Sequence, residues 1–214
     1  MRKMNFASKS LVLLLSIFAA GGADKNAPFK PGPTDSYPCR QTQEKVTIAV
    51  QPFDTEEKTR LAFDKLDPNR YGILPVLVII RNDGPGTLML EGLRVEYFTE
   101  SRQGLEAIPS REVAKVNSPG RPHVSGGPLP TQIPRSSTKK NPLTAWEIEG
   151  RAFAAKALPP GELASGFFYF EARHRSGAAL YITGLREAPS RRELFYFEIP
   201  LDAQGRDEAA PNRH

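Results

Sequence analysis

Histidines, cysteine and serines are the side chains of this sequence that could carry out chemistry. His123, His174 and His214 lie far apart, and none shares a short-spacing motif with a second metal ligand. Metal sites that can be recognised from sequence place two ligands only a few residues apart. We therefore predict no metal and no organic cofactor.

The motifs of serine hydrolases and nucleotide-binding loops are incomplete. A nucleophile elbow needs GxSxG, but His123 stands at the first glycine position of HVSGG and Leu163 stands there in the segment around Ser165. The turn NDGPG (82–86) contains a GxG, but Met89 replaces the third glycine of a dinucleotide fingerprint. We predict that the protein is not an enzyme. A hydrolase whose site is assembled only by the fold is an open alternative, because catalytic triads are defined by geometry.

Cys39 is the single cysteine of the chain, so it has no partner for an internal disulfide. It lies in PTDSYPCRQ, where no neighbouring histidine could activate it as a nucleophile. Two interpretations stay open. Cys39 is either a free thiol or forms an intermolecular disulfide, since disulfides persist outside the cytosol.

Residues 1–23 have the three-part layout of a secretory signal peptide. Arg2, Lys3 and Lys9 precede the apolar run LVLLLSIFAA, which ends at the small residues GGA. That run is about half the ~20 residues that a membrane-spanning helix needs. We predict cleavage after Ala23 and an exported chain, periplasmic or secreted, with no transmembrane segment in its mature form. An uncleaved signal anchor is the alternative.

Removal of the signal peptide also removes most of the net charge. The sequence has 29 lysines and arginines against 24 acidic residues, and residues 1–23 hold three of the cations and none of the acids. The mature balance of 26 to 24 gives no basic face of the kind that binds nucleic acid or anionic membranes. We expect neither as a partner.

The mature chain is long enough for one domain with loose ends. Residues 24–43 predict a flexible, proline-rich lead-in, and residues 202–214 predict a disordered tail. Both have too little apolar surface to offset the entropy lost on ordering. Residues 44–201 form the predicted domain.

Most of this domain has the period-two pattern of β-strands. KVTIAVQ (45–51) predicts a strand with one face buried, whereas GILPVLVII (72–80) is apolar on both faces and predicts a central strand. Turn residues follow at 82–86, and LMLEGLRVEYF (88–98) predicts the returning strand.

One segment predicts a short amphipathic helix that covers the β-core. In DTEEKTRLAFDKLDP (54–68), Asp54 or Thr55 can cap the first turn, and Glu56 is spaced for an ion pair with Arg60. An apolar stripe then runs through Ala62, Phe63 and Leu66.

Residues 117–142 contain six prolines and three glycines, which excludes a long helix or a central strand. Segments of this length without secondary structure are uncommon inside a domain, and they are either tolerated insertions or functional loops. As a functional loop, this insertion would bind a protein partner. The residues expected to do so are Arg121, His123, Arg135, Lys139 and Lys140.

Aromatic strands dominate the C-terminal part. Residues 145–157 predict one or two short strands, with Trp146 at a core or edge position. Residues 163–170 and 193–201 predict two further strands. Alternation places Phe167 and Tyr169 opposite Phe168 and Phe170, and places Phe195, Phe197 and Ile199 opposite Leu194 and Tyr196. We expect these aromatic side chains to lie mostly in the core.

Short strands separated by turns, with one helix, predict a mainly β fold, an antiparallel β-sandwich. A small β-barrel is the alternative, because periodicity does not separate the two. The buried strand ending in Asn82-Asp83-Gly84, the segment LPPGELASGFFYFE and the closing strand LFYFEIPL resemble immunoglobulin-like domains of exported bacterial proteins, many of them uncharacterised. This resemblance covers 44–201 and implies a fold, but no catalytic or binding residue.

The function predicted from these observations is that of an exported, non-enzymatic binding or assembly module. It would engage a protein partner in the cell envelope through loops or sheet edges. A carrier of a small apolar ligand, held between the aromatic strands, is the first alternative. The fold-assembled hydrolase is the second.

Overall fold

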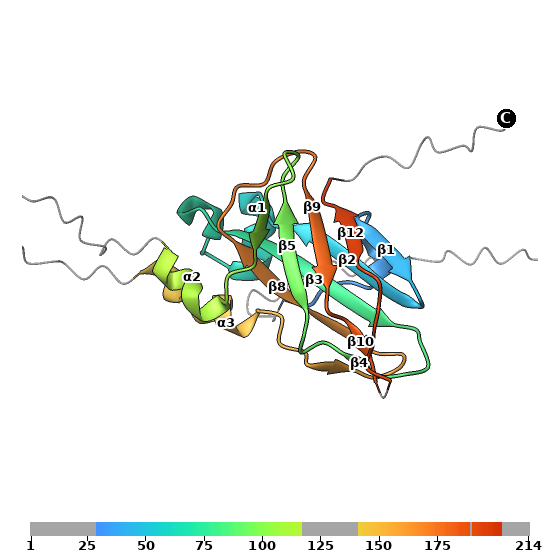
Figure 1. The fold of residues 1–214 in the computed structure, drawn as a ribbon. Coiled ribbons are helices and arrows are strands. Elements are labelled where there is room, and N and C mark those ends of the chain that lie inside the picture. Colours follow the sequence, from blue (N-terminus) through green and yellow to red (C-terminus); the bar gives the residue numbers. More distant parts are fainter. Residues whose placement is uncertain (1–28, 117–140, 189, 203–214) are drawn as a thin grey trace, which may run out of the picture.

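The computed structural model describes residues 29–116, 141–188 and 190–202 (Figure 1). The predicted signal peptide (1–23), residues 117–140 of the insertion and the tail from residue 203 lie outside these ranges. Within them the chain is mainly β, and its strands form three antiparallel sheets that do not close into a barrel. The barrel alternative is therefore wrong.

In the described part of the chain, each of the three sheets has four strands, but the strands differ in length from sheet to sheet. Sheet A has the order β1 (Arg40–Gln43), β2 (Val46–Pro52), β3 (Leu74–Asn82), β8 (Leu163–Phe170). Sheet C has the order β12 (Phe197–Pro200), β9 (Ala179–Thr183), β5 (Arg94–Phe98), β6 (Gly104–Glu106). The small sheet B has the order β11 (Arg192–Glu193), β10 (Arg186–Glu187), β4 (Leu88–Met89), β7 (Ala157–Leu158).

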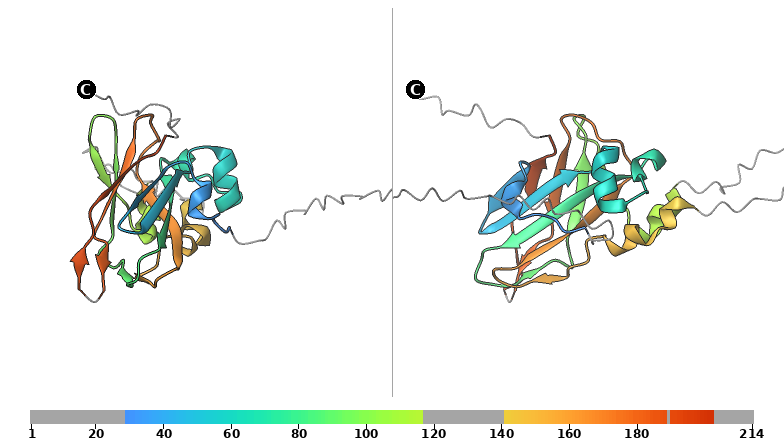
Figure 2. Two further views of the ribbon diagram at one scale, coloured as in Figure 1. Left: turned by 90° about the vertical axis from the view of Figure 1, so that its right-hand side faces the viewer. Right: turned by 180° about the vertical axis from the view of Figure 1, so that it is seen from behind.

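Sheet A forms the middle of three layers (Figure 2). Sheet C covers one of its faces, and short helices cover the other. The helices are α1 (Glu56–Phe63), α2 (Ser110–Val116) and α3 (Trp146–Gly150), with the 3-10 turns η1 (Thr34–Ser36), η2 (Pro68–Tyr71) and η3 (Pro142–Thr144). Strands β5, β9 and β12 lie in front in Figure 1, so the outer face of sheet C is the face seen there.

Strand β3 confirms the prediction of a central strand buried on both sides. Val76, Val78 and Ile80 belong to the apolar core shared with sheet C, whereas Leu77 and Ile79 belong to the core under the helices. The β-branched run suits this position because such side chains pack well on a pleated surface.

Strand β2 and the helices differ from the prediction. Thr47 and Ala49, expected to face solvent, are buried, and Ala49 packs in the core under the helix layer. Only one helix was expected, but residues 110–116 and 146–150 are also helical. In α3 a single apolar side chain, Ile148, is buried. One buried residue cannot show whether the apolar pattern repeats with the period of a helix or of a strand.

The start of sheet A also differs from the expected domain boundary. The predicted lead-in 24–43 overlaps β1, which pairs with β2 through residues 40–43. The hydroxyls of Thr42 and Thr47 lie 2.9 Å apart across this pair. The short polar strand RQTQ shows no alternation of apolar and polar residues, so its sequence is typical of a loop. Its backbone nevertheless pairs with β2 in sheet A.

Helix α1 agrees with its prediction. The Thr55 side chain accepts a hydrogen bond from the backbone N–H of Lys58 and caps the first turn, and Arg60 pairs with Glu56 at 2.6 Å. Ala62 and Phe63 are buried against sheet A. In the part of the chain that the structure describes, no helix has both the length and the apolar character needed to cross a bilayer.

Candidate functional site

The partner-binding residues predicted from the sequence, Arg121, His123, Arg135, Lys139 and Lys140, all lie outside the described residues. Their role therefore stays a prediction.

A serine, a histidine and an aspartate meet where the β8–β9 turn approaches the end of β12. His174 Nε2 lies 3.2 Å from Asp202 Oδ1, while His174 Nδ1 lies 3.5 Å from the hydroxyl of buried Tyr97. Ser176 Oγ donates to Asp202 Oδ2 at 3.1 Å, and the Gly177 N–H donates to the same oxygen at 2.6 Å. The pKa of Asp202 is lowered, first by the Gly177 N–H and then by Ser176 and His174.

This cluster does not have the connectivity of a catalytic triad. In a triad the histidine accepts the serine proton while the acid holds its other ring nitrogen. Here Ser176 binds the carboxylate, so the imidazole does not activate its hydroxyl. The cluster instead ties the β8–β9 turn to the C-terminal end of sheet C. Among the described residues, no group of histidine, cysteine and acidic side chains could hold a metal ion.

The Gly-rich turn after β3 is filled by its own asparagine. Asn82 is fully buried, and its Nδ2 donates to the carbonyls of Gly86 and Leu158 at 2.8 and 3.0 Å. Its Oδ1 accepts from the Gly84 N–H at 3.0 Å. Since the donors and acceptor of this side chain are used within the fold, the turn builds a sheet connection.

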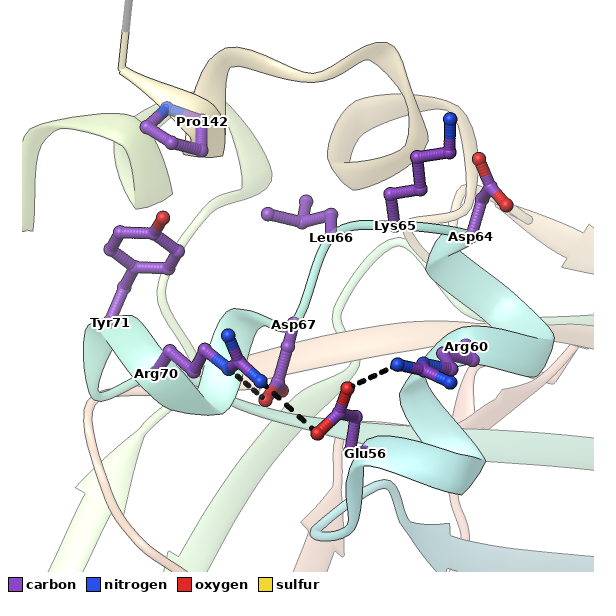
Figure 3. Close-up of a pocket in the computed structure, with 9 residues that line it drawn as sticks. All are labelled: Glu56, Arg60, Asp64, Lys65, Leu66, Asp67, Arg70, Tyr71 and Pro142. Carbon is purple, nitrogen blue, oxygen red and sulfur yellow. Dashed lines mark hydrogen bonds and ion pairs between the residues drawn. The ribbon is translucent and has the colours of Figure 1, made fainter.

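The hollow beside α1 and η2 has a volume of about 730 Å³ and contains charges that neutralise one another (Figure 3). The Glu56 carboxylate forms ion pairs with the guanidinium groups of Arg60, at 2.6 Å, and Arg70, at 3.1 Å. Arg70 Nε also lies 3.4 Å from Asp67 Oδ2. The pKa of Glu56 is lowered by Arg60 and then by Arg70. These largely exposed pairs form a surface network of modest energy, with its charges already engaged by one another.

Cys39 lies in the core between sheets A and C. The side chain is 8% exposed, and its Sγ donates to the Leu201 carbonyl at 3.4 Å. Burial, and then the Asp202 carboxylate, raise the pKa of the thiol. A disulfide to another chain needs an accessible thiolate, so the folded structure favours the free thiol over the intermolecular disulfide.

A groove opens on the side of the molecule where β5 and β6 approach β8. It has a volume of about 680 Å³. Its apolar lining includes Phe153 and Phe168, whose rings stack with centroids 5.4 Å apart. Arg94, Glu96 and Glu106 reach the same groove from sheet C.

The outer face of sheet C carries aromatic side chains on three neighbouring strands or their ends. The rings of Tyr181 and Tyr196 stack with centroids 4.9 Å apart, and Phe98 meets Tyr181 edge-on at 5.9 Å. We call Phe98, Tyr181 and Tyr196 the aromatic face. Tyr196 is 51% exposed, and its neighbour Phe195 is 70% exposed.

The expectation that these aromatic residues lie in the core is wrong for the segment that leads into β12. Leu194, Phe197 and Ile199 are buried, so the strict alternation expected across 193–201 breaks between Phe195 and Tyr196. The break lies between β11 and β12, where the chain leaves sheet B and joins sheet C. Trp146 is likewise exposed, at 67%, at the start of α3.

Carboxylates cross the same outer face in one row. Glu198 pairs in register with Tyr181, Tyr181 with Glu96, and Glu96 with Glu106. Within the described ranges none of these three glutamates takes part in an ion pair. We call Glu96, Glu106 and Glu198 the acidic row.

Comparison with family models and with curated proteins found no match. Among solved structures, the chain is similar to the X-ray structure of Northeast Structural Genomics Consortium target SoR45, with 11% sequence identity and a TM-score of 0.33. That similarity covers 79% of this chain and 97% of the other.

Proposed function

We propose that the protein is an exported, non-enzymatic binding module with an immunoglobulin-like β-sandwich scaffold, and that a protein partner docks on the aromatic face of sheet C. The packing of sheets A and C across one apolar core supports the scaffold. The signal peptide predicted at residues 1–23 supports a partner in the cell envelope or outside the cell.

The observation that carries this proposal is that aromatic side chains are exposed to solvent and do not contribute to either apolar core. Phe195 and Tyr196 lie outside both apolar cores, although the strand that follows them buries Phe197 and Ile199. Connected apolar patches on a soluble protein mark interaction surfaces, and aromatic residues are enriched at the centres of protein interfaces. Sheet C offers such a patch on the face opposite the helices.

Crosslinked co-purification from the envelope or secreted fraction tests the proposal. We expect the wild-type protein to capture a defined partner and the double variant Tyr181→Ser, Tyr196→Ser to lose it. The matched control is Trp146→Ser, which removes an aromatic ring of similar exposure from the helix side. Equal capture by wild type and the tyrosine variant, with both folded by circular dichroism, would refute docking on this face.

A second candidate function is the carriage of a small apolar ligand in the groove beside β8. Its volume of about 680 Å³ is in the usual range for small-molecule sites, and Phe153 and Phe168 offer apolar contacts. Bound ligand stabilises the folded state. We expect a member of a lipophile panel to raise the melting temperature of wild type but not of Phe168→Ser, and a panel without any shift would remove this candidate.

A further inference from the structure

We propose that the segment docking on the aromatic face is extended and cationic, with lysine or arginine side chains that pair with the acidic row. This inference rests on the proposed function and adds the chemistry of the partner. It is carried by the register of sheet C and by the charges that this register aligns.

The acidic row destabilises the folded protein when no partner is bound. Glu96 and Glu106 are directly opposite one another on neighbouring strands, and like charges at such positions destabilise a sheet. Arg94, the cation nearest in the β5 sequence, lies opposite Thr183 in the adjacent row and forms no ion pair with these glutamates. A binding partner that supplies cations would relieve this repulsion.

The environment of Tyr181 supports the same chemistry. Partial burial raises the pKa of this tyrosine, and neighbouring Tyr196, Glu198 and Glu96 raise it further. The carboxylates of Glu198 and Glu96, which lie opposite Tyr181 on the two neighbouring strands, therefore act on this side chain. A cation placed here would gain from the carboxylates and from the π-faces of the tyrosines together.

The spacing of the row fits an extended segment that crosses the strands. Neighbouring strands are about 4.8 Å apart, so the stems of Glu198 and Glu96 are separated by about 10 Å with Tyr181 between them. A polyproline II segment repeats every three residues, or about 9.3 Å. Cationic residues at i and i+3 of such a segment would reach both carboxylates while its backbone lies over the tyrosine ring.

Isothermal titration with synthetic peptides tests this inference. The probes are 12-residue peptides of repeating Pro-Pro-Arg, Pro-Pro-Gln and Pro-Pro-Glu. We expect wild-type protein to bind the arginine peptide at least tenfold more tightly than the glutamine peptide, to reject the glutamate peptide, and to lose affinity as salt is raised. The double variant Glu96→Gln, Glu198→Gln should bind the arginine peptide at least fivefold more weakly.

The matched control is Glu57→Gln, Glu149→Gln, which removes the same charge from exposed positions on α1 and α3. Its affinity should equal that of wild type. No preference for the arginine peptide, or an equal loss in both double variants, would overturn the inference. If the native partner is lost from Tyr181→Ser, Tyr196→Ser but kept by Glu96→Gln, Glu198→Gln, the docking face stands and its cationic partner does not.

Discussion

Asn82 is a residue whose neighbours in the sequence suggest a binding loop but whose side chain belongs to the fold. It joins the end of β3 to the turn at Gly84 and Gly86 and to the Leu158 carbonyl on β7. Its own carbonyl accepts from the Gly161 N–H at 2.7 Å. One buried side chain therefore connects sheet A to sheet B.

We expect Asn82→Ala to lower the free energy of unfolding by about 2–3 kcal/mol, because buried backbone groups lose their partners. Urea unfolding measures this change. Asp83→Asn is the control, since it removes only an exposed pair with Arg81 and should cost less than about 1 kcal/mol. A loss below about 0.5 kcal/mol for Asn82→Ala would contradict the assigned role.

Asp202 gives stability that depends on pH. Its pKa is lowered in the folded state by the Gly177 N–H, Ser176 and His174. The folded protein thus binds the proton of this carboxyl less readily than the unfolded chain, whose aspartate pKa is about 3.9. The resulting stability is present above that value and is lost as the pH falls through the lower, folded pKa.

The variant Asp202→Asn should therefore be less stable than wild type at pH 7, and the difference should shrink as the pH falls below about 4. Urea unfolding of both proteins at pH 7, 5, 4 and 3 provides the comparison. A difference that stays constant over this range would show that the aspartate acts by shape alone.

At single residues, contacts between near neighbours in the sequence could be predicted, but contacts between distant residues could not. A cap by Asp54 or Thr55 and the Glu56–Arg60 pair follow from local spacing; Thr55 forms the cap, and the ion pair is present. The contact of Tyr97 with His174, 77 positions away, depends on which strands become neighbours. No local pattern contains that information.

At the scale of elements, strand β8 has an outer edge that a non-strand segment covers. The Phe153 N–H donates to the Phe167 carbonyl at 3.1 Å, and the Phe167 N–H donates to the Arg151 carbonyl at 2.9 Å. This close approach requires a residue without a side chain. A Cβ on Gly166 would lie 2.3 Å from Cα and 2.5 Å from N of Phe153.

We expect Gly166→Ala to destabilise the protein by about 3 kcal/mol or more, because backbone has to move to admit the methyl group. Gly161→Ala is the control. Gly161 has a φ of +78°, but a methyl group there would meet no atom within 4 Å, so the strain alone should cost about 1 kcal/mol. Thermal unfolding should rank the variants in this order, and equal losses would contradict the close contact.

Elements were predictable where one pattern persisted over many residues. Residues 74–80 of β3 are apolar on both faces and could be assigned from composition. The aromatic face could not, because its exposure depends on the break between β11 and β12. The only signal in the sequence was four bulky residues in succession, LFYF, more than one buried face of a strand accommodates.

At the scale of the whole molecule, sheet A is shared by two apolar cores. Its β3 side chains alternate between the core facing sheet C and the core under the helices. The mainly β class could be predicted from the sequence, but the order of strands could not, since β3 ends at Asn82 and pairs with β8, which begins only at Leu163. Such pairing is decided by burial in the complete fold.

The sharing of sheet A predicts that both outer layers unfold together. Removal of either layer would expose one apolar face of β2 and β3, so an intermediate that lacks one layer should be too unstable to accumulate. Leu77→Ala weakens the helix-side core and Ile80→Ala weakens the core under sheet C. Each should cost about 2–5 kcal/mol, whereas exposed Leu61→Ala should change stability by less than about 0.5 kcal/mol.

Two probes separate the layers in this experiment. Trp146 fluorescence reports on the helix layer, and far-UV circular dichroism reports mainly on the sheets. We expect their urea midpoints to coincide in wild type and to fall together in both core variants. If Leu77→Ala shifted only the fluorescence transition, the helices would form a separately unfolding unit and sheets A and C would be stable without them.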